Sequence, residues 1–385
     1  MILSENGGRV GIIAGETSGD NHGARVVREM YLKNSGLEIF GIGGPMMRQE
    51  GAEIITDAST LSVVGITEVF SKLPAVFREA SRMKSELLRR RPDLLILIDF
   101  PDFNLYMAKF ARKHKVPVLY YISPQIWAWR RRRVGRIKKY VDRMAVILPF
   151  EVDFYKEHGI CATFVGHPML DHYAEEGSGG TSEAGNSDQT VIGLLPGSRR
   201  SEIARNLPVM LAAARRLESS IGGIRFIVSM APGIEQHFME NFTSPYKGVV
   251  DVEIQSGPIE DVLKKCTLVV AASGTVTLEA AIFGVPMVII YRVSPVSYLL
   301  GRMLVRVEHI GLANIIAGER VVPELIQNKA EPSEIARTVT HLLSDEDALG
   351  ELRRRLRSVR AKLGEAGASA RTAEIALSMI RYKKT

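Results

Sequence analysis

Short, mostly apolar runs alternate with longer amphipathic stretches along most of this 385-residue chain. Such runs, without regular polar alternation, are typical of strands that are buried on both faces of a parallel sheet. The stretches between them have the length of helices that cross over such a sheet. In the first half, strands are predicted at residues 10–14, 39–42, 94–98, 118–122 and 144–148. The pattern therefore predicts an α/β fold built on a doubly wound parallel sheet.

The alternation stops at residues 175–190, where no apolar side chain is larger than alanine, and we expect a linker or a long surface loop there. It resumes with strands predicted at residues 191–195, 226–229, 249–254, 268–271 and 287–291. Helices close the chain, and Ser344 is expected to cap the first of them. We therefore expect a domain over 1–174, a second domain over 191–345 and C-terminal helices over 346–385. Ligands of such sheets bind beyond the carboxyl ends of the strands.

Composition adds only a little to what the pattern indicates about the class of protein and its partners. A hydrophobic content of 46% and a charged content of 24% are typical of a globular protein. Cys161 and Cys266 stand alone, which excludes a disulfide framework and favours a reducing cytoplasm. The formal charge of +7 favours anionic partners such as nucleotides, phospholipid headgroups or nucleic acid. The most apolar window, 266–291, is interrupted by Gly284 and Pro286, so we expect strand, turn, helix and strand there rather than a membrane span.

Loops at predicted strand ends of the first domain carry candidate chemistry. Residues 15–23 are small enough to let the backbone approach a ligand, but they lack the glycine spacing of NAD and ATP sites. Asp99 directly follows a strand, where apolar neighbours would raise its pKa, and it is a candidate general base. A carboxylate salt-bridged at the sheet edge fits that position equally well. His22 is the competing base or a hydrogen-bonded loop histidine, and Asp102 is interpreted as a helix N-cap.

Two strand-end loops of the second domain suit an anion. The loop after the strand predicted at 191–195 places a glycine and a hydroxyl beside a guanidinium. The loop after the strand predicted at 268–271 leads into a helix whose first N–H groups bind anions. Glu279 lies one helical turn, ~6 Å, beyond the second loop, within reach of a ribose; alternatively it is an acid near a helix N-terminus. The candidate residues are Gly197, Ser198, Arg199, Ser273, Gly274, Thr275 and Glu279.

A basic run and an apolar run have several interpretations. Trp127 and Trp129 are followed by seven cations within residues 130–139. This combination fits single-stranded nucleic acid, an anionic membrane surface or a solvated helix face. Residues 61–77 are more apolar than one helix face needs, and they fit either a membrane interface or the core. No clustered histidine or cysteine motif supports a metal site.

A series of segments resembles, in order, the motifs of bacterial lipid-A-disaccharide synthases. They are AGETSGDNHGA at 14–24, GIGGPMM at 41–47, IDFPDFN at 98–104, YYISPQIWAWRRRRVGRI at 120–137, LPFE at 148–151, VGHPMLD at 165–171, LLPGSRRSEI at 194–203, ASGTVTLEAA at 272–281 and ANIIAGERVVPELIQ at 313–327. They cover almost the whole chain. Residues 175–190 and those beyond about 330 carry little of the resemblance.

The resemblance implies a GT-B glycosyltransferase, with two doubly wound Rossmann-like domains facing each other across a cleft. We expect no metal and no cofactor. The resemblance also implies transfer of diacylglucosamine from UDP onto diacylglucosamine 1-phosphate, which gives a β-1,6-linked disaccharide with inversion. That reaction needs a base and fixed positive charge. The family's essential aspartate falls on Asp99, and His22 is the reserve candidate. The expected substrate-binding residues are Ser18, Gly19, Asp20, Asn104, Gly197, Ser198, Arg199, Ser273, Gly274, Thr275, Glu279, Asn314 and Gln327.

Lipid substrates also imply peripheral docking on the anionic inner membrane from the cytoplasm. The expected contact residues are Val64, Val69, Phe70, Leu73, Val76, Phe77, Trp127, Trp129, Arg130 and Arg131. The family further implies a homodimer paired through its C-terminal domain, and no nucleic-acid partner. The alternatives are another GT-B enzyme, such as a UDP-N-acetylglucosamine transferase or epimerase, and a nucleic-acid-binding protein that uses residues 127–139.

Overall fold

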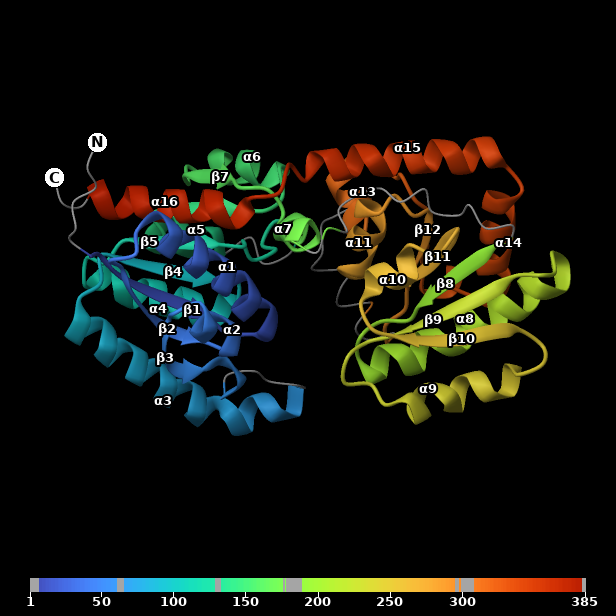
Figure 1. Cartoon of the computed structure of the whole chain (residues 1–385), viewed down its shortest axis with the longest axis horizontal. Helices are drawn as coiled ribbons and strands as arrows, with labels where there is room; N and C mark the ends of the chain where they lie inside the picture. The colour runs from blue at the N-terminus through green and yellow to red at the C-terminus, as the bar shows by residue number, and fades with distance from the viewer. Residues whose placement is uncertain are drawn as a thin grey trace. The chain divides into compact units, whose positions relative to one another are not determined.

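The computed structural model describes residues 7–60, 66–128, 133–175, 177, 189–294, 298 and 308–382, without the side chains of 66–73 and 381–382. The chain divides into two compact units (Figure 1). Unit 1 contains Met1–His172 together with Gly364–Thr385, and unit 2 contains Tyr173–Leu363. Within the described part of the chain, no helix is both long enough and apolar enough to cross a membrane.

Unit 1 is built on a seven-stranded parallel sheet in the order β3-β2-β1-β4-β5-β6-β7. The strands are β1 (Arg9–Ala14), β2 (Glu38–Gly43), β3 (Glu53–Asp57), β4 (Leu94–Ile98), β5 (Val118–Tyr121), β6 (Arg143–Val146) and β7 (Ala162–Phe164). Every residue of β4 is buried, because helices cover both faces of the sheet. Ala14 pairs with Ile98, so the loops that follow β1 and β4 leave the sheet side by side.

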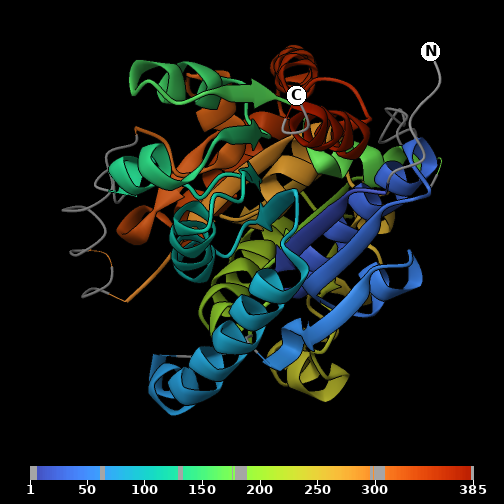
Figure 2. The ribbon, with the colours of Figure 1, turned by 90° about the vertical axis from the view of Figure 1, so that its left-hand side faces the viewer.

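Helices pack on both faces of this sheet. They are α1 (Thr17–Lys33), α2 (Pro45–Gln49), α3 (Ile66–Arg90), α4 (Pro101–Lys113), α5 (Val134–Tyr140), α6 (Phe150–Glu157) and the C-terminal α16 (Ala368–Tyr382), while α7 (Pro168–Glu175) crosses the unit boundary. One core cluster joins the sheet to α3, α4 and α5, and the other joins it to α1 and α16. Figure 2 shows α3, in light blue, and α16, in red, on opposite sides of the blue strands.

Unit 2 has a six-stranded parallel sheet in the order β10-β9-β8-β11-β12-β13. Counted within the unit this order is 3-2-1-4-5-6, the Rossmann arrangement. The strands are β8 (Val191–Leu195), β9 (Arg225–Met230), β10 (Asp251–Ser256), β11 (Leu268–Ala272), β12 (Met287–Tyr291) and β13 (Glu324–Ile326). The helices are α8 (Arg200–Ser220), α9 (Gln236–Thr243), α10 (Ile259–Leu263), α11 (Val276–Ile282), α13 (Leu312–Ala317), α14 (Pro332–Leu343) and α15 (Glu346–Lys362).

The structure confirms the predicted fold class of two parallel-sheet α/β units. The predicted strands are present, with ends that differ by a few residues. The pattern missed β3, β7 and β13, which all lie at sheet edges. Edge strands have fewer neighbours to bury them, so β3 keeps a glutamate and an aspartate at its two ends, and its hydrophobic pattern is weak.

Two predicted helix caps are wrong. Phe100 is the N-cap of α4, because Pro101 already occupies the first turn, and Asp102 lies inside that turn. Ser344 ends α14, whereas Asp345 caps α15 by accepting a hydrogen bond from the backbone N–H of Ala348 at 2.9 Å. In both cases the cap differs from the expectation by one or two residues, which is the usual uncertainty of helix ends.

The two C-terminal helices belong to different units. α15 packs on α11, α13 and α14 of unit 2, whereas α16 packs on α1 and β4 of unit 1. The carboxylate of Asp171 accepts hydrogen bonds from the backbone N–H groups of Gly367, Ala368 and Ser369 at 2.6–2.9 Å. These bonds tie the start of α16 to unit 1. Most of the expected linker, 176 and 178–188, lies outside the described residues.

Candidate functional site

The backbone around Asp99 is held in an unusual conformation at the end of β4. Asp99 and Phe100 have φ values of 45° and 46°, in the left-handed region that side chains other than glycine rarely adopt. The carbonyl oxygen of Asp99 accepts hydrogen bonds from the Asn104 amide at 2.7 Å and from the Tyr120 hydroxyl at 2.5 Å. Asn104 also donates to the carbonyl oxygen of Ile98 at 3.0 Å. Strain that surrounding contacts maintain in this way is a recurrent feature of functional sites.

The environment of Asp99 suits proton transfer. Burial raises the pKa of its carboxyl group to about 6, and the negative charge of Glu16 adds to this effect. A hydrogen bond from the backbone N–H of Phe100 acts in the opposite direction. A carboxylate with a pKa near neutrality is mostly ionised at pH 7 and is still a stronger base than a solvated aspartate.

A cavity of about 310 Å³ opens beside Asp99, at the carboxyl ends of β4, β5 and β6. Its lining residues are Asp99, Pro101, Ile122, Ser123, Pro124, Gln125, Ile126, Arg133, Ile147, Leu148 and Glu151. This volume is at the lower end of the range of ligand pockets. Two carboxyl groups and one guanidinium of the described residues therefore share a small site where the fold class predicts ligand binding.

Glu151 is a buried lining residue that the sequence interpretation missed. It accepts hydrogen bonds from the indole N–H of Trp127 at 3.2 Å and from the backbone N–H of Leu148 at 3.1 Å. Burial raises the pKa of Glu151 to about 7. Its position in the LPFE segment, directly after a predicted strand, was the available signal. Arg133 was missed because it stands in a run of arginines that looks like a solvated surface.

His22 has a different environment from Asp99. Its Nδ1 atom is buried and has no hydrogen-bond partner among the described residues. Burial and the nearby Arg25 guanidinium lower the pKa of His22 to about 4, against the opposing effect of Asp171. The imidazole is therefore neutral at pH 7 and a weak proton acceptor.

The loop that follows β1 contains Ser18, Gly19 and Asp20. Asp20 is buried, and its carboxylate accepts hydrogen bonds from the backbone N–H groups of Gly44, Met46 and Met47 at 2.7–3.1 Å. These contacts cap the first turn of α2, so they account for Asp20 without a ligand. Ser18 is exposed at the start of α1, whereas Gly19 is buried.

In unit 2, the loop that follows β8 presents Ser198 and Arg199 on the surface. Gly197 has a φ of 115°, and a Cβ there would lie 2.6 Å from the Glu202 carboxylate, so a glycine is required. Glu202 accepts hydrogen bonds from the backbone N–H of Ser198 and from the guanidinium of Arg199, both at 3.2 Å. The Arg199 side chain is 78% exposed, so its remaining N–H groups can reach a ligand.

The loop that follows β11 leads into α11. Gly274 and Thr275 are exposed, while the Ser273 hydroxyl donates to the carbonyl oxygen of Ile310 at 3.3 Å. Glu279 accepts a hydrogen bond from the hydroxyl of Tyr173 at 3.2 Å. Burial raises the pKa of Glu279 above its usual value, so this acid is not simply a solvated first-turn residue.

Asn314 and Gln327, both expected to bind substrate, use their amides on the protein itself. The Asn314 amide donates to Val322 and Glu324 and accepts from the backbone of Val321 and Val322, all at 2.8–2.9 Å. Gln327 pairs with both backbone groups of Val293, at 2.9 and 3.1 Å. Asn314 therefore holds the segment that leads into β13, and Gln327 holds the segment that follows β12.

Glu324 is a second buried acid that the sequence interpretation missed. Its carboxylate accepts hydrogen bonds from the backbone N–H groups of Ile310 and Gly311 and from the Asn314 amide, with closest distances of 2.8–3.1 Å. It therefore holds the start of α13 and the segment that Ser273 contacts. Its partners lie 10–14 positions earlier in the chain, and nothing adjacent to Glu324 in the sequence indicates them.

Trp127 was expected to face the membrane, and the structure corrects this prediction. Its ring is buried, it bonds to Glu151, and it packs edge-on against Phe150 at 4.9 Å between ring centroids. Val76 packs against the core and Phe77 is 57% exposed. The remaining positions lie outside the described residues or side chains: Val64, Val69, Phe70, Leu73, Trp129, Arg130 and Arg131.

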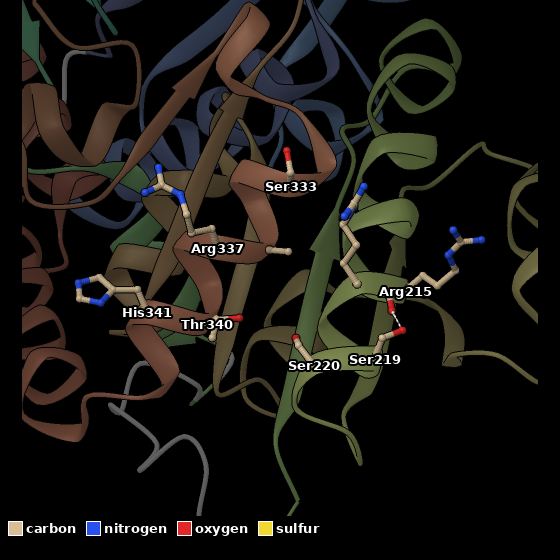
Figure 3. Close-up of a pocket in the computed structure, with 9 residues that line it drawn as sticks. Arg215, Ser219, Ser220, Ser333, Arg337, Thr340 and His341 are labelled. Carbon is tan, nitrogen blue, oxygen red and sulfur yellow. Dashed lines mark hydrogen bonds between the residues drawn. The ribbon is translucent and has the colours of Figure 1, made fainter.

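A larger pocket, of about 770 Å³, lies between α8 and α14 (Figure 3). It is lined by Arg215, Arg216, Ser219, Ser220, Ser333, Ala336, Arg337, Thr340 and His341. None of these described lining residues is a predicted site residue, so volume does not identify the site in this fold. Among the described residues, no group of three or more histidine, cysteine, aspartate or glutamate side chains is arranged to hold a metal ion.

The two Rossmann-like units, with polar residues at the carboxyl ends of both sheets, define the GT-B class of fold. Solved structures agree at the level of the fold. The glycotransferase of kitacinnamycin has a TM-score of 0.64 at 15% identity and covers 97% of this chain and 100% of its own. UDP-GlcNAc 2-epimerase from Neisseria meningitidis, bound to UDP-GlcNAc, has a TM-score of 0.64 at 12% identity, with coverage of 96% and 100%.

Sequence relatives are more specific. The family described as Lipid-A-disaccharide synthetase matches residues 10–379. The lipid-A-disaccharide synthase of Geobacter sulfurreducens is 46% identical over 377 residues, which are 97% of each chain. That of Nitrosococcus oceani is 44% identical over 374 residues, 96% of each chain. The chain belongs to the lipid-A-disaccharide synthase family, which comprises glycosyltransferases of lipid A biosynthesis.

Proposed function

We propose that this enzyme moves 2,3-diacylglucosamine from UDP onto 2,3-diacylglucosamine 1-phosphate, giving the β-1,6-linked lipid A disaccharide 1-phosphate and UDP. UDP-sugars carry an α linkage, so a β product requires direct displacement. The 6-hydroxyl oxygen of the acceptor bonds to the anomeric carbon, the bond to the diphosphate oxygen breaks, and the hydroxyl proton passes to a base. Family membership supports the substrate class.

The observation that carries the proposal is the state of Asp99. Its carboxyl group has a raised pKa, lines a cavity of about 310 Å³ and has a backbone held by Asn104 and Tyr120. These features favour Asp99 as the base. His22 is the weaker candidate, because a pKa of about 4 leaves its imidazole little affinity for the proton.

Unit 2 is the proposed site of the UDP group. Ser198, Arg199, Gly274 and Thr275 are exposed at the carboxyl ends of β8 and β11, where nucleotides bind in such sheets. Arg199 supplies the positive charge that a leaving diphosphate needs. Glu279 is the proposed partner of the ribose hydroxyls. Asn314 and Gln327 support this site by fixing neighbouring loops.

The central experiment incubates the purified enzyme with UDP-diacylglucosamine and diacylglucosamine 1-phosphate and identifies products by mass spectrometry. We expect the disaccharide 1-phosphate and stoichiometric UDP. Asp99→Asn should lower kcat by about 10²–10⁴ because the base is lost. Isomerised monosaccharide with no disaccharide would favour an epimerase instead and overturn the proposal.

Arg199→Ala tests the donor side. We expect kcat to fall by about 10²–10³, equivalent to about 2.7–4 kcal/mol of barrier, while the circular-dichroism spectrum stays unchanged. Arg225→Ala is the matched control, since Arg225 is also exposed but begins β9 at the amino end of the sheet. Full activity in Arg199→Ala would remove Arg199 from this role.

We further propose peripheral attachment to the anionic inner membrane and a homodimer, both on the basis of the lipid substrates and the family. The exposed Phe77 and the basic residues near α5 support attachment. Release of the protein from membranes by a high-salt wash is expected; retention in the membrane fraction would contradict electrostatic attachment. Light scattering in detergent tests the dimer, and absence of binding to single-stranded RNA at physiological salt excludes the nucleic-acid alternative.

A further inference from the structure

Among the described residues that line the cavity beside Asp99, Arg133 is the cation. Arg133 occupies the N-cap position of α5, and its side chain is only 12% exposed. A guanidinium so far removed from water loses hydration energy, which must be recovered from partners of opposite charge. The residues around Arg133 therefore indicate what this cavity is built to hold.

Arg133 bonds through Nη2 to the carboxylate of Asp102, whose own side chain is 72% exposed. This bond uses one of the five N–H donors of a guanidinium. Because Asp102 is on the first turn of α4 and Arg133 precedes α5, the pair fixes the guanidinium at the cavity wall. Donors remain for an incoming anion, and a planar fork of N–H groups suits phosphate oxygens.

The other charged lining residues direct where an anion can lie. Asp99 and Glu151 are both acids, so a phosphate near either would be repelled when the carboxyl group is ionised. Glu151 is already bonded to Trp127 and Leu148, so it does not offer a free counter-charge. Among the described lining residues, only Arg133 attracts an anionic group, so the anion is favoured on its side of the cavity and an uncharged part of the ligand toward Asp99.

We infer that Arg133 binds the phosphate monoester of the acceptor sugar and so orients its hydroxyl group toward Asp99. The inference rests on the proposed function and adds the residue that recognises one end of the acceptor. A volume of about 310 Å³ suits a sugar phosphate but not its acyl chains, which must leave the cavity. Arg133, at one side of a small cavity, sets both the affinity for the phosphorylated acceptor and its direction.

A cycle of two acceptors and two enzymes tests this inference. The acceptors are diacylglucosamine 1-phosphate and the same lipid without the phosphate, and the enzymes are the parent and Arg133→Ala. We expect removal of the phosphate to lower kcat/KM of the parent about 10–100-fold, and to have almost no further effect in Arg133→Ala. The KM for the UDP-sugar should stay the same. Equal losses on both acceptors, or no loss on either, would overturn the inference.

A binding measurement keeps this test independent of turnover. Glucosamine 1-phosphate and glucosamine are soluble probes for isothermal titration calorimetry or ligand-observed NMR. The parent should bind the phosphorylated sugar more tightly, and Arg133→Ala should lose that preference. Equal binding of both sugars by the parent would reject the inference even if disaccharide synthesis is found. Conversely, phosphate-selective binding without disaccharide formation would support the role of Arg133 and reject the proposed reaction.

Arg136→Ala is the matched control. Arg136 lies on α5, one turn beyond Arg133, is exposed and does not line the cavity. Its replacement should leave both the acceptor preference and the binding preference unchanged. A loss of phosphate preference in Arg136→Ala equal to that in Arg133→Ala would point to the general positive charge of this surface and would contradict a specific role for Arg133.

Discussion

The side-chain amide of Asn104 donates a hydrogen bond to the backbone carbonyl oxygen of Asp99 across 2.7 Å. The same amide holds the carbonyl oxygen of Ile98, so one buried residue fixes the two peptide groups at which β4 ends. Asp99 and Phe100 follow with positive φ values, which need such support. The position of the proposed base therefore depends on a side chain that does not itself need to touch the substrate.

Asn104→Ala tests this positioning role. Without the amide, we expect kcat to fall at least about tenfold while the KM for the UDP-sugar stays constant, because the Asp99 carboxylate loses its fixed orientation. The free energy of unfolding should fall by about 1–3 kcal/mol. Steady-state kinetics and urea unfolding measure the two effects. Asn241→Ala, at an exposed position on α9, is the control and should change neither. Unchanged kcat in Asn104→Ala would refute the role.

The raised pKa of Asp99 predicts a pH dependence of activity. Below pH about 6 the carboxyl group is protonated and cannot accept the hydroxyl proton, so log kcat/KM should fall with decreasing pH through about 6. A pH–rate profile of the parent measures this limb. A profile that stays flat from pH 5 to 8 would argue against Asp99 as the base.

The same shift has a consequence for stability. Because the pKa of Asp99 is higher in the folded protein, ionisation favours the unfolded chain, and stability falls as pH rises from about 4 to about 6. Asp99→Asn removes this cost and should raise the melting temperature at pH 7.5, with a smaller gain at pH 4. Calorimetry at the two pH values measures the difference. An equal change at both pH values would mean that ionisation of Asp99 is not its source.

The contact between Glu151 and Trp127 predicts a spectroscopic titration. Burial raises the pKa of Glu151 to about 7, so the charge beside the indole ring should change near neutral pH. In a Trp129→Phe background, the emission of Trp127 should titrate with a midpoint near pH 7. Glu151→Gln should abolish this titration while retaining an oxygen that can accept the indole N–H. A midpoint unaffected by Glu151→Gln would assign the titration to another group.

Glu324 predicts a large effect on the stability of unit 2. Glu324→Ala leaves the N–H groups of Ile310 and Gly311 and one donor of Asn314 without their acceptor, so urea unfolding should show a loss of about 2–4 kcal/mol. Asn314→Ala should add less than its separate effect in the double variant, because both residues belong to one network. The exposed Glu331→Ala should cost less than about 0.5 kcal/mol. Full additivity would contradict the network.

The sequence predicted the central strands well and the edges poorly. β4 and β8 are continuous apolar runs because both faces of each strand are covered, and this pattern needs no knowledge of the neighbours. β3, β7 and β13 lie at sheet edges and carry weaker patterns. Asp99 was identifiable for a related reason, since a carboxyl group at the end of a buried strand is conspicuous in the sequence itself.

The sequence did not show which polar side chains are available to a ligand and which are hydrogen-bonded within the protein. Asp20, Asn314 and Gln327 were expected to bind substrate, yet the structure gives each of them partners within the protein. Trp127 looked like a membrane anchor because cations follow it, yet its ring is buried beside Glu151. The sequence shows each of these side chains beside its neighbours along the chain, whereas their hydrogen-bond partners lie mostly in other loops and helices.

The sequence by itself determined the two parallel sheets, the loops at their carboxyl ends and the family, because hydrophobic periodicity and local motifs are properties of adjacent residues. The tertiary structure decided which of those loop residues remain available to a ligand. Arg133 lies at the cavity wall because it pairs with Asp102 on α4. Asp171 binds the start of α16, which is almost 200 positions further along the chain. Such contacts depend on how distant segments pack against each other. A polar group that is hydrogen-bonded in such a contact is not available to a ligand.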